Sequence, residues 1–205
     1  MTLLFNNFLT WLQNHMSIKY EGERVRFQEL HEDEVDRIVW VHELCECPEK
    51  ALFEQNFPVL TATVRYKPAV MLGELVHIAL EQWGIEYGPQ IYHKTIDVDG
   101  EKVMVAGMPD YVSKACDTVV DFKYSVHIGQ EPLQHHILQV QLYMWLCDVK
   151  NGELWYFTHD AFKSFPVEIP ASDENVMQEI RHRSTPRWPE WECKYCEYRQ
   201  ICRYG

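Results

Sequence analysis

The chain has 205 residues, 46% of them hydrophobic and 13% aromatic, enough to fill one domain or one domain with an appended element. No apolar run reaches the roughly 18–20 residues that a membrane span needs, so no membrane association is expected. The formal net charge of −12 argues against a protein that coats nucleic acid through bulk positive charge, but it is compatible with an acidic site that recruits a cation.

The first elements expected along the chain are helices around one short strand. An amphipathic helix is expected at about 3–15, followed by an acidic, poorly patterned stretch to about 37. A strand at 38–42 leads into a helix at about 48–57, because Pro48 suits a first helical turn. A largely apolar helix follows at 69–84 and ends at a glycine.

The second half of the chain alternates strands with helices. The dipeptide Asp99-Gly100 is a strong hairpin signal between the first two of these strands. The expected strands span about 90–98, 102–112, 117–124, 153–159 and 163–169, and the expected helices span about 132–149 and 172–183. Strands clustered between helices predict an α/β core with a mixed sheet.

Three titratable residues interrupt the apolar helix at 69–84. Glu74, His77 and Glu81 fall at positions i, i+3 and i+7, which lie on one face of a helix. A buried helix directs such a stripe towards something polar, whereas a partly exposed helix simply turns it to solvent. The stripe alone leaves both interpretations open.

Two strand motifs and the long helix add further polar residues. Gly107 lies inside a strand pattern, which often marks a bulge or a close backbone approach, and Asp110 follows it. In Asp121-Phe-Lys123, alternation along a strand places the carboxylate and the ammonium on one face, although such a pair is often just an exposed charge pair. On the long helix, helical spacing puts His135 or His136 on one face with Gln139 and Tyr143.

Taken together, these side chains are suited to phosphodiester hydrolysis. Two carboxylates, Asp110 and Asp121, and the imidazole of His77 suit Mg²⁺ or Mn²⁺, and the imidazole favours Mn²⁺. Such a cation activates water and offsets charge on a phosphate, and Lys123 beside it is placed to orient the nucleophile or to stabilise the phosphorus.

The motifs resemble those of the PD-(D/E)XK nucleases, and within them the RecB-like branch. His77 in Gly-Glu-Leu-Val-His, Asp110 in Gly-Met-Pro-Asp, Asp121-Phe-Lys123 and the motif from Gln139 to Tyr143 match its four motifs in order. The resemblance implies a restriction-endonuclease-like core with metal ligands His77, Asp110 and Asp121, and with Lys123, Gln139 and Tyr143 in the catalytic site. Asp rather than the commoner Glu at 121 is a departure that the signature tolerates.

The seven cysteines are interpreted as metal ligands before disulfides. The N-terminal apolar stretch lacks the basic region and the cleavage site of a secretory signal, so we expect a mature cytoplasmic protein. Cys193, Cys196 and Cys202 form a C-x₂-C-x₅-C run, and an early cysteine, Cys47, directly precedes a proline. Three close thiols and a remote fourth suit an iron–sulfur cluster better than zinc, which more often uses two C-x₂-C pairs, but both remain open.

Cys45 competes with Cys47 as the fourth ligand, and the Cys-Pro pairing at a helix start favours Cys47. Cys116 and Cys147 are expected to be buried or spectator thiols.

One cysteine before the nuclease motifs and three after them is an arrangement that resembles the fourth CRISPR-associated (Cas) protein family. This resemblance implies a cluster, of which 4Fe–4S is the expected type, held by Cys47, Cys193, Cys196 and Cys202. The cluster would join a helical segment at about 1–57 to a cysteine-rich segment at about 186–205 within one domain over residues 1–205. Glu49 stands where the family commonly has arginine, which puts a DNA contact there in doubt.

The same resemblance implies a metal-dependent exonuclease on single-stranded DNA, acting in CRISPR spacer acquisition and antiviral defence. The implied partners are single-stranded DNA and the spacer-integration proteins, with a homo-oligomer also possible. Residues 181–205 hold six basic and three acidic side chains, and Arg181, Arg183 and Arg187 are candidates to contact phosphates. The rival functions are a non-catalytic DNA-binding or adaptor subunit with a structural cluster, and a zinc-stabilised nuclease.

Overall fold

The computed structural model describes residues 7, 11, 22–57, 60, 68–83, 90–182 and 186–204. The helix expected at 3–15 lies outside these ranges except for two residues. Within them, no helix is both long and apolar enough to cross a membrane.

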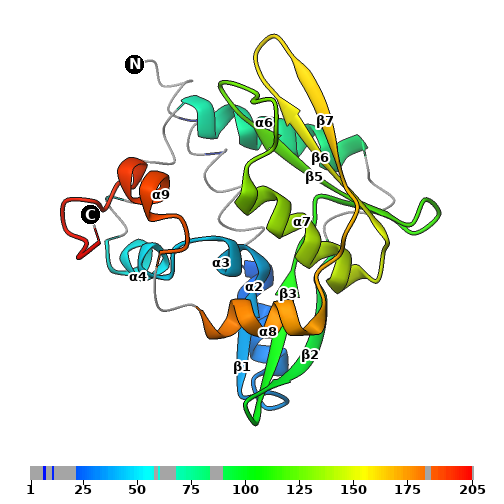
Figure 1. Ribbon diagram of the computed structural model, residues 1–205, viewed down its shortest axis with the longest axis vertical. Helices are drawn as coiled ribbons and strands as arrows, with labels where there is room; N and C mark the ends of the chain where they lie inside the picture. The colour runs from blue at the N-terminus through cyan, green and yellow to red at the C-terminus, as the bar shows by residue number, and fades with distance from the viewer. Residues whose placement is uncertain are drawn as a thin grey trace.

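The strands of the described residues form two mixed sheets (Figure 1). The first has the order β1-β3-β2, with β1 parallel and β2 antiparallel to β3. The second has the order β4-β5-β6-β7, in which β5 and β6 are parallel and the outer pairs are antiparallel. The strands span Arg37–Trp40 (β1), Tyr92–Val98 (β2), Glu101–Gly107 (β3), Tyr111–Ser113 (β4), Thr118–Tyr124 (β5), Asn151–Phe157 (β6) and Phe162–Val167 (β7).

The hairpin between β2 and β3 is confirmed, but the strand expected at 102–112 is not continuous. Asp99 and Gly100 have positive φ of 57° and 88°, as the tight turn requires. The chain leaves the first sheet after Gly107 and enters the second at Tyr111. Pro109 lies in this break, and because proline has no N–H to offer a sheet, it favours the interruption that separates the two sheets.

Helix α7 is the central helix, since it contacts strands of both sheets and helix α3. Its buried side chains run from Leu138 to Cys147, and α6 packs on β5 of the second sheet. The helices span Gly22–His31 (α2), Val41–Cys45 (α3), Pro48–Asn56 (α4), Pro68–Trp83 (α6), Gln134–Cys147 (α7), Asp173–Arg181 (α8) and Pro189–Tyr195 (α9).

Apart from the five-residue α3, which replaces the end of the strand expected at 38–42, two helices lie where the sequence pattern predicts none. Helix α2 lies in the stretch interpreted as poorly patterned, and it buries only Phe27. Helix α9 spans just seven residues of the cysteine-rich end. Neither carries a repeating apolar stripe long enough to stand out in the sequence.

Gly152 on β6 lets α7 pack directly against the strand. A Cβ atom at this position would overlap Val140 Cγ1 and crowd Met144 Sδ, and both neighbours are fully buried. A side chain here would therefore push the central helix away from the second sheet.

Substitution Gly152→Ala should lower the free energy of unfolding by about 1–3 kcal/mol, the usual cost of overpacking a core. Urea denaturation followed by tryptophan fluorescence measures this loss. The matched control is Gly22→Ala, because a Cβ at Gly22 meets no atom within 4 Å. Equal stability of the two variants would contradict the close approach of α7 to β6.

Candidate functional site

Strand β5 presents Asp121 and Lys123 on one face, as its alternation predicts. Phe122 between them points to the other side, where its ring packs 5.3 Å from that of Trp155 and 6.3 Å from that of Phe157, centroid to centroid. Asp121 is only 3% exposed and is the one buried charged residue of the described chain. This buried carboxylate with an ammonium beside it differs from the exposed charge pair that the motif more often forms.

Asp110 and His77 join this face from two other elements. Asp110 lies between β3 and β4, and its Oδ2 accepts a hydrogen bond of 2.7 Å from the backbone N–H of Phe122. Its Oδ1 lies 3.1 Å from Nδ1 of His77 on α6. One carboxylate therefore connects β5 to α6, and it is the polar partner of His77 in the stripe on α6. The side chains of Glu74 and Glu81 lie outside the described part.

Lys123 connects the carboxylates to helix α7. Its Nζ lies 2.9 Å from Oδ2 of Asp121 and donates a hydrogen bond of 2.7 Å to Oε1 of Gln139. The amide of Gln139 in turn donates to the hydroxyl of Tyr143 at 3.3 Å. The structure thus brings together all six residues expected at the nuclease site.

The two histidines before Gln139 take other partners. His136 Nδ1 lies 2.6 Å from the hydroxyl of Tyr156. The ring of His135 lies 4.7 Å from that of Trp191 on α9. Only Gln139 and Tyr143 of this expected face therefore belong to the hydrogen-bonded chain that starts at Lys123.

Burial and neighbouring charges give the carboxyl groups of Asp110 and Asp121 different pKa values. Burial, reinforced by the neighbouring Asp110 and opposed by Lys123, raises the pKa of Asp121 to about 6. Burial also acts to raise the pKa of Asp110, but the charge and hydrogen bond of His77 outweigh it and lower that pKa. The pKa of Lys123 is raised because Asp121 and Asp110 outweigh its burial. At neutral pH the site therefore holds two carboxylates around one ammonium.

The donor set fits a divalent cation, although no three His, Cys, Asp or Glu side chains of the described residues already surround a common point. Oδ2 of Asp121 is buried and accepts no hydrogen bond of good geometry within the described chain, despite its short contact with Lys123. A buried carboxylate oxygen of this kind is a ready ligand, and carboxylates with one imidazole suit Mn²⁺ or Mg²⁺.

Gly107 is a residue whose place in the site the sequence did not reveal. A Cβ here would lie 2.8 Å from Cε1 of Tyr143 and 3.0 Å from Val41 Cγ2. The close backbone approach expected of this glycine is confirmed, and it lets Tyr143 sit against β3.

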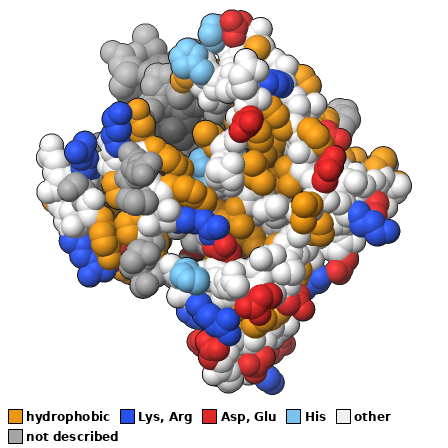
Figure 2. All heavy atoms as spheres, viewed as in Figure 1, with side chains coloured by type: hydrophobic (Ala, Val, Ile, Leu, Met, Phe, Trp, Pro, Cys, Tyr) orange, Lys and Arg blue, Asp and Glu red, His pale blue; other side chains and the backbone are white. Residues whose placement is uncertain are grey.

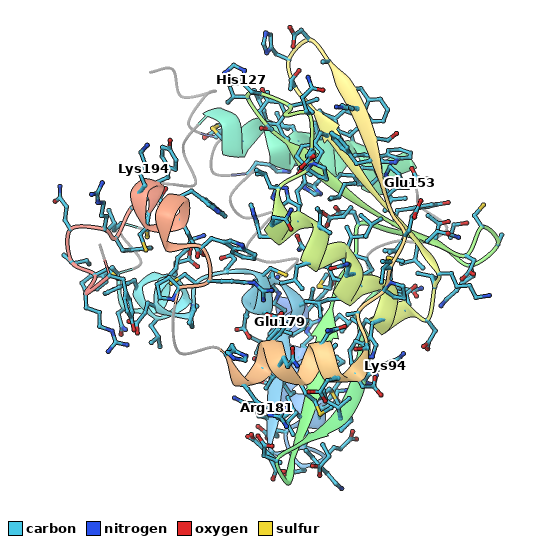
Figure 3. The ribbon with its side chains drawn as sticks, viewed as in Figure 1. Lys94, His127, Glu153, Glu179, Arg181 and Lys194 are labelled. Atoms are coloured by element: carbon cyan, nitrogen blue, oxygen red, sulfur yellow. The ribbon has the colours of Figure 1, made fainter. Side chains whose placement is uncertain are left out.

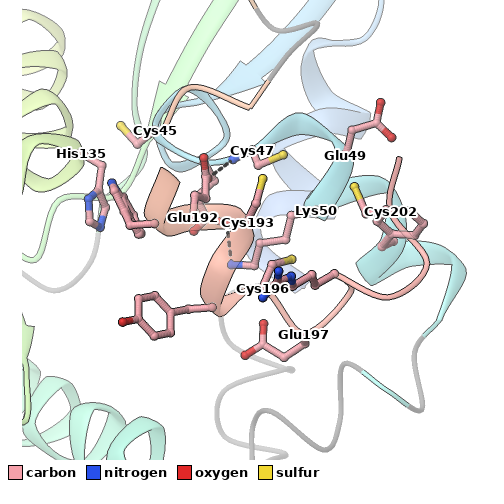
Figure 4. Close-up of a pocket in the computed structure, with 15 residues that line it drawn as sticks. Cys45, Cys47, Glu49, Lys50, His135, Glu192, Cys193, Cys196, Glu197 and Cys202 are labelled. Atoms are coloured by element: carbon pink, nitrogen blue, oxygen red, sulfur yellow. Dashed lines mark hydrogen bonds and ion pairs between the residues drawn. The ribbon is translucent and has the colours of Figure 1, made fainter. Parts of the chain in front are cut away.

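The two cysteine-bearing segments meet in one cavity between α4 and α9 (Figure 4). Its volume is about 200 Å³, against about 30 Å³ for one water molecule, so a group of several atoms fits. The cysteines that line it are Cys45, Cys47, Cys193, Cys196 and Cys202. Cys116 is exposed and Cys147 is buried, and neither lines the cavity.

Three contacts pin the early segment to the late one. The backbone N–H of Cys47 donates to Glu192 at 2.7 Å, and the rings of Phe53 and Tyr198 stack with centroids 5.4 Å apart. Arg203 donates to Glu49 at 2.6 Å, so the unexpected glutamate at this position serves an ion pair within the chain.

Cys45 and Cys47 differ in where they point. The sulfur of Cys47 faces those of Cys193, Cys196 and Cys202 in Figure 4, whereas that of Cys45 lies towards His135. Burial strongly raises the pKa of the Cys45 thiol and also raises that of Cys47. A thiolate ligand is therefore better placed at Cys47.

The arginines expected to contact phosphates are already paired where they are described. Arg181, on α8 (Figure 3), donates two hydrogen bonds to Asp99, and Arg187 pairs with Glu179. Arg183 lies outside the described residues. A phosphate at Arg181 or Arg187 would have to compete with a carboxylate.

The fold and the site together define a class of enzyme. A model of the PD-(D/E)XK nuclease superfamily matches residues 84–203, more than half of the chain, and the chain belongs to this superfamily. The α/β architecture with mixed sheets and flanking helices is the fold expected from the motifs, and the membership gives the chain a nuclease role.

The resemblance to the CRISPR-associated family is also confirmed. The chain is 27% identical over 179 residues to the CRISPR-associated exonuclease Cas4 of Saccharolobus solfataricus, which covers 82% of this chain and 88% of that protein. It is likewise similar to the crystal structure of SSO0001, with a TM-score of 0.73 and 27% identity over 82% of this chain and 86% of that one.

Removing the charge of Lys123 should raise the pKa of Asp121 above its value of about 6, because the ammonium opposes the effect of burial. In Lys123→Met the rise should be roughly one unit or more, as for a close opposite charge. A ¹³C NMR titration of aspartate carboxyls measures it, with the resonance assigned by its loss in Asp121→Asn. The control Lys150→Met, at an exposed lysine, should leave the titration unchanged. A lower pKa in Lys123→Met would contradict the charge pairing.

Proposed function

We propose that this protein is a divalent-metal-dependent exonuclease on single-stranded DNA that acts in CRISPR spacer acquisition and antiviral defence. The observation that carries the proposal is the joint position of Asp110, Asp121 and Lys123, with His77 as a third donor. The similarity to a protein named CRISPR-associated exonuclease Cas4 supports the exonuclease activity and the CRISPR context.

In the proposed site, His77, Asp110 and Asp121 hold Mn²⁺ or Mg²⁺. When bound, the cation supplies Lewis-acid chemistry, which activates water and offsets negative charge on the phosphate. Lys123 faces the same space and neutralises charge that develops at the phosphorus. Gln139 fixes Lys123 through a 2.7 Å hydrogen bond, and Tyr143 holds Gln139, so both act by positioning the ammonium.

The four cysteines Cys47, Cys193, Cys196 and Cys202 are proposed to hold an iron–sulfur cluster of the 4Fe–4S type. The common cavity and the contacts between α4 and α9 support this ligand set. A bond set between these residues closes a loop around strands β2 to β7, which restricts the unfolded chain by roughly 4–5 kcal/mol on the cross-link estimate. The first role of the cluster is therefore structural.

The partners follow from the proposed role. They are single-stranded DNA and the CRISPR spacer-integration proteins, with self-association into a homo-oligomer and a cytoplasmic location. Part of the phosphate contact is proposed for Arg181, Arg183 and Arg187, although Asp99 and Glu179 compete for two of them.

An adaptor without catalysis is the alternative function. The intact set of Asp110, Asp121 and Lys123 disfavours it, because a buried carboxylate without a function is costly to keep in a core.

Asp110→Asn and Asp121→Asn should each reduce Mn²⁺-dependent cleavage of end-labelled single-stranded DNA by about a hundredfold or more, since each removes a charged ligand. The melting temperature and the visible absorbance should stay close to those of the wild type. Asp33→Asn removes the same charge from an exposed turn and should cleave normally. Near wild-type activity of either site variant under saturating Mn²⁺ would remove that residue from the metal site and favour the adaptor.

Cys47→Ala should lose the brown colour of an iron–sulfur protein and melt at a lower temperature, because the late segment is released from α4. Absorbance near 400 nm, iron content and calorimetry of anaerobically purified protein measure this. Cys45→Ala and Cys116→Ala should keep the colour. A colourless wild type that contains zinc would instead support the zinc-stabilised nuclease, and bleaching by Cys45→Ala alone would exchange the two ligands.

A further inference from the structure

The C-terminal segment at 186–204 exposes two large aromatic side chains on one short helix. Tyr195 is 71% exposed and Trp191 is 40% exposed. They are four residues apart on α9, so they lie next to each other on one side of the helix. The Trp191 ring packs against His135 and Trp188, with centroids 4.7 and 6.1 Å away, so the Tyr195 ring is the freer of the two to stack on flat, apolar groups.

Cations border these rings. Nζ of Lys194 lies 5.3 Å from the centroid of the Tyr195 ring, and Figure 3 shows Lys194 on the outer side of α9. Arg199 is exposed in the turn that follows. Within the described chain, neither Lys194 nor Arg199 forms an ion pair with a carboxylate, in contrast to Arg181 and Arg187.

The charge of this surface stands out against an acidic protein. Figure 2 shows blue basic and orange hydrophobic side chains over the part of the molecule that holds α9 and the C-terminus, whereas red acidic side chains gather near the tips of β1 and β2. With a net charge of −12 for the whole chain, this positive area is where a polyanion approaches with least repulsion.

The surface is also close to the proposed nuclease site. Trp191 contacts His135, and His135 precedes Gln139 by one turn of α7, about 6 Å along the helix. Gln139 is bonded to Lys123. A chain held on α9 therefore lies within a few nucleotides of the catalytic residues.

We infer that Trp191, Tyr195, Lys194 and Arg199 form a stacking platform for the unpaired bases of single-stranded DNA. Bases stack on exposed aromatic rings without sequence preference, and neighbouring cations contact the phosphates. In duplex DNA the base faces are covered by neighbouring bases, so the platform favours single strands. The inference rests on the proposed nuclease function and adds the surface that holds its substrate.

The test measures binding of fluorescein-labelled dT15 by fluorescence anisotropy in EDTA, which prevents cleavage. Tyr195→Ala should weaken binding about tenfold or more, whereas Tyr195→Phe, which keeps the ring, should bind like the wild type. The pair Lys194→Gln and Arg199→Gln together should weaken binding and reduce its salt dependence. Phe162→Ala and Lys150→Gln are the matched controls, since both residues are exposed on other parts of the protein.

An abasic strand of equal length separates stacking from charge. The wild type should bind dT15 about tenfold more tightly than the abasic strand, and Tyr195→Ala should lose this preference. Because Tyr195 also borders the cysteine cavity, iron content and melting temperature are measured for each variant. Lys194→Gln alone supplies an independent result if Tyr195→Ala loses its iron, because Lys194 does not line the cavity whereas Arg199 does.

Three outcomes would overturn the inference. In the first, the wild type binds dT15 and the abasic strand equally well. In the second, Tyr195→Ala and the charge variant both bind dT15 as tightly as the wild type. In the third, polyglutamate displaces dT15 as effectively as unlabelled DNA does, which would indicate an acidic peptide partner. Hydrolysis of bis(p-nitrophenyl) phosphate by the wild type with Mn²⁺ tests the nuclease function separately. Base-dependent binding without hydrolysis would reject that function and keep the platform.

Discussion

The largely enclosed ammonium of Lys123, beside the buried Asp121, is the constraint around which the site is built. An unpaired charge in a protein interior costs several kcal/mol, so Lys123 is tolerated only with its partners in place. Asp121 supplies the opposite charge from the same strand, and Gln139 supplies an acceptor from α7. The pairing therefore fixes the position of the central helix relative to the second sheet as well as the chemistry of the site.

The path of the chain around this pair follows from the break after Gly107. The chain turns from the first sheet to the second there, and the turn places Asp110 where it accepts the N–H of Phe122. Gly107 itself has no side chain, which allows Tyr143 to approach β3 closely enough to hold Gln139. Backbone geometry and side-chain chemistry at the site thus depend on the same few residues.

Much of this arrangement could be predicted from the sequence, because it depends on short repeats. The two-residue period around Phe122 predicts that Asp121 and Lys123 share a face, and Asp99-Gly100 predicts the hairpin.

The division into two sheets could not be predicted. The apolar run through Gly107 is continuous in the sequence, and the break depends on a contact of Asp110 with a residue distant in sequence. Helices α2 and α9 could not be predicted because tertiary contacts stabilise them, Phe27 against Trp40 in one case and Trp191 against His135 in the other. Arg181 pairs with a residue far away in the sequence, and the pair of Arg187 follows no local pattern. The count of basic residues in the C-terminal segment therefore suggested that both arginines are free.

The contact between Cys47 and Glu192 has a consequence for the order in which the protein matures. During synthesis Glu192 emerges 145 residues after Cys47, when every strand of both sheets has already left the ribosome. The early segment with α4 must therefore wait, with its apolar side chains and thiol uncovered, until the last part of the chain arrives. Contacts between such distant residues form slowly because a long loop must close first. Cofactor delivery to the cysteine cavity is consequently a late event, and the nuclease core has the opportunity to fold before it.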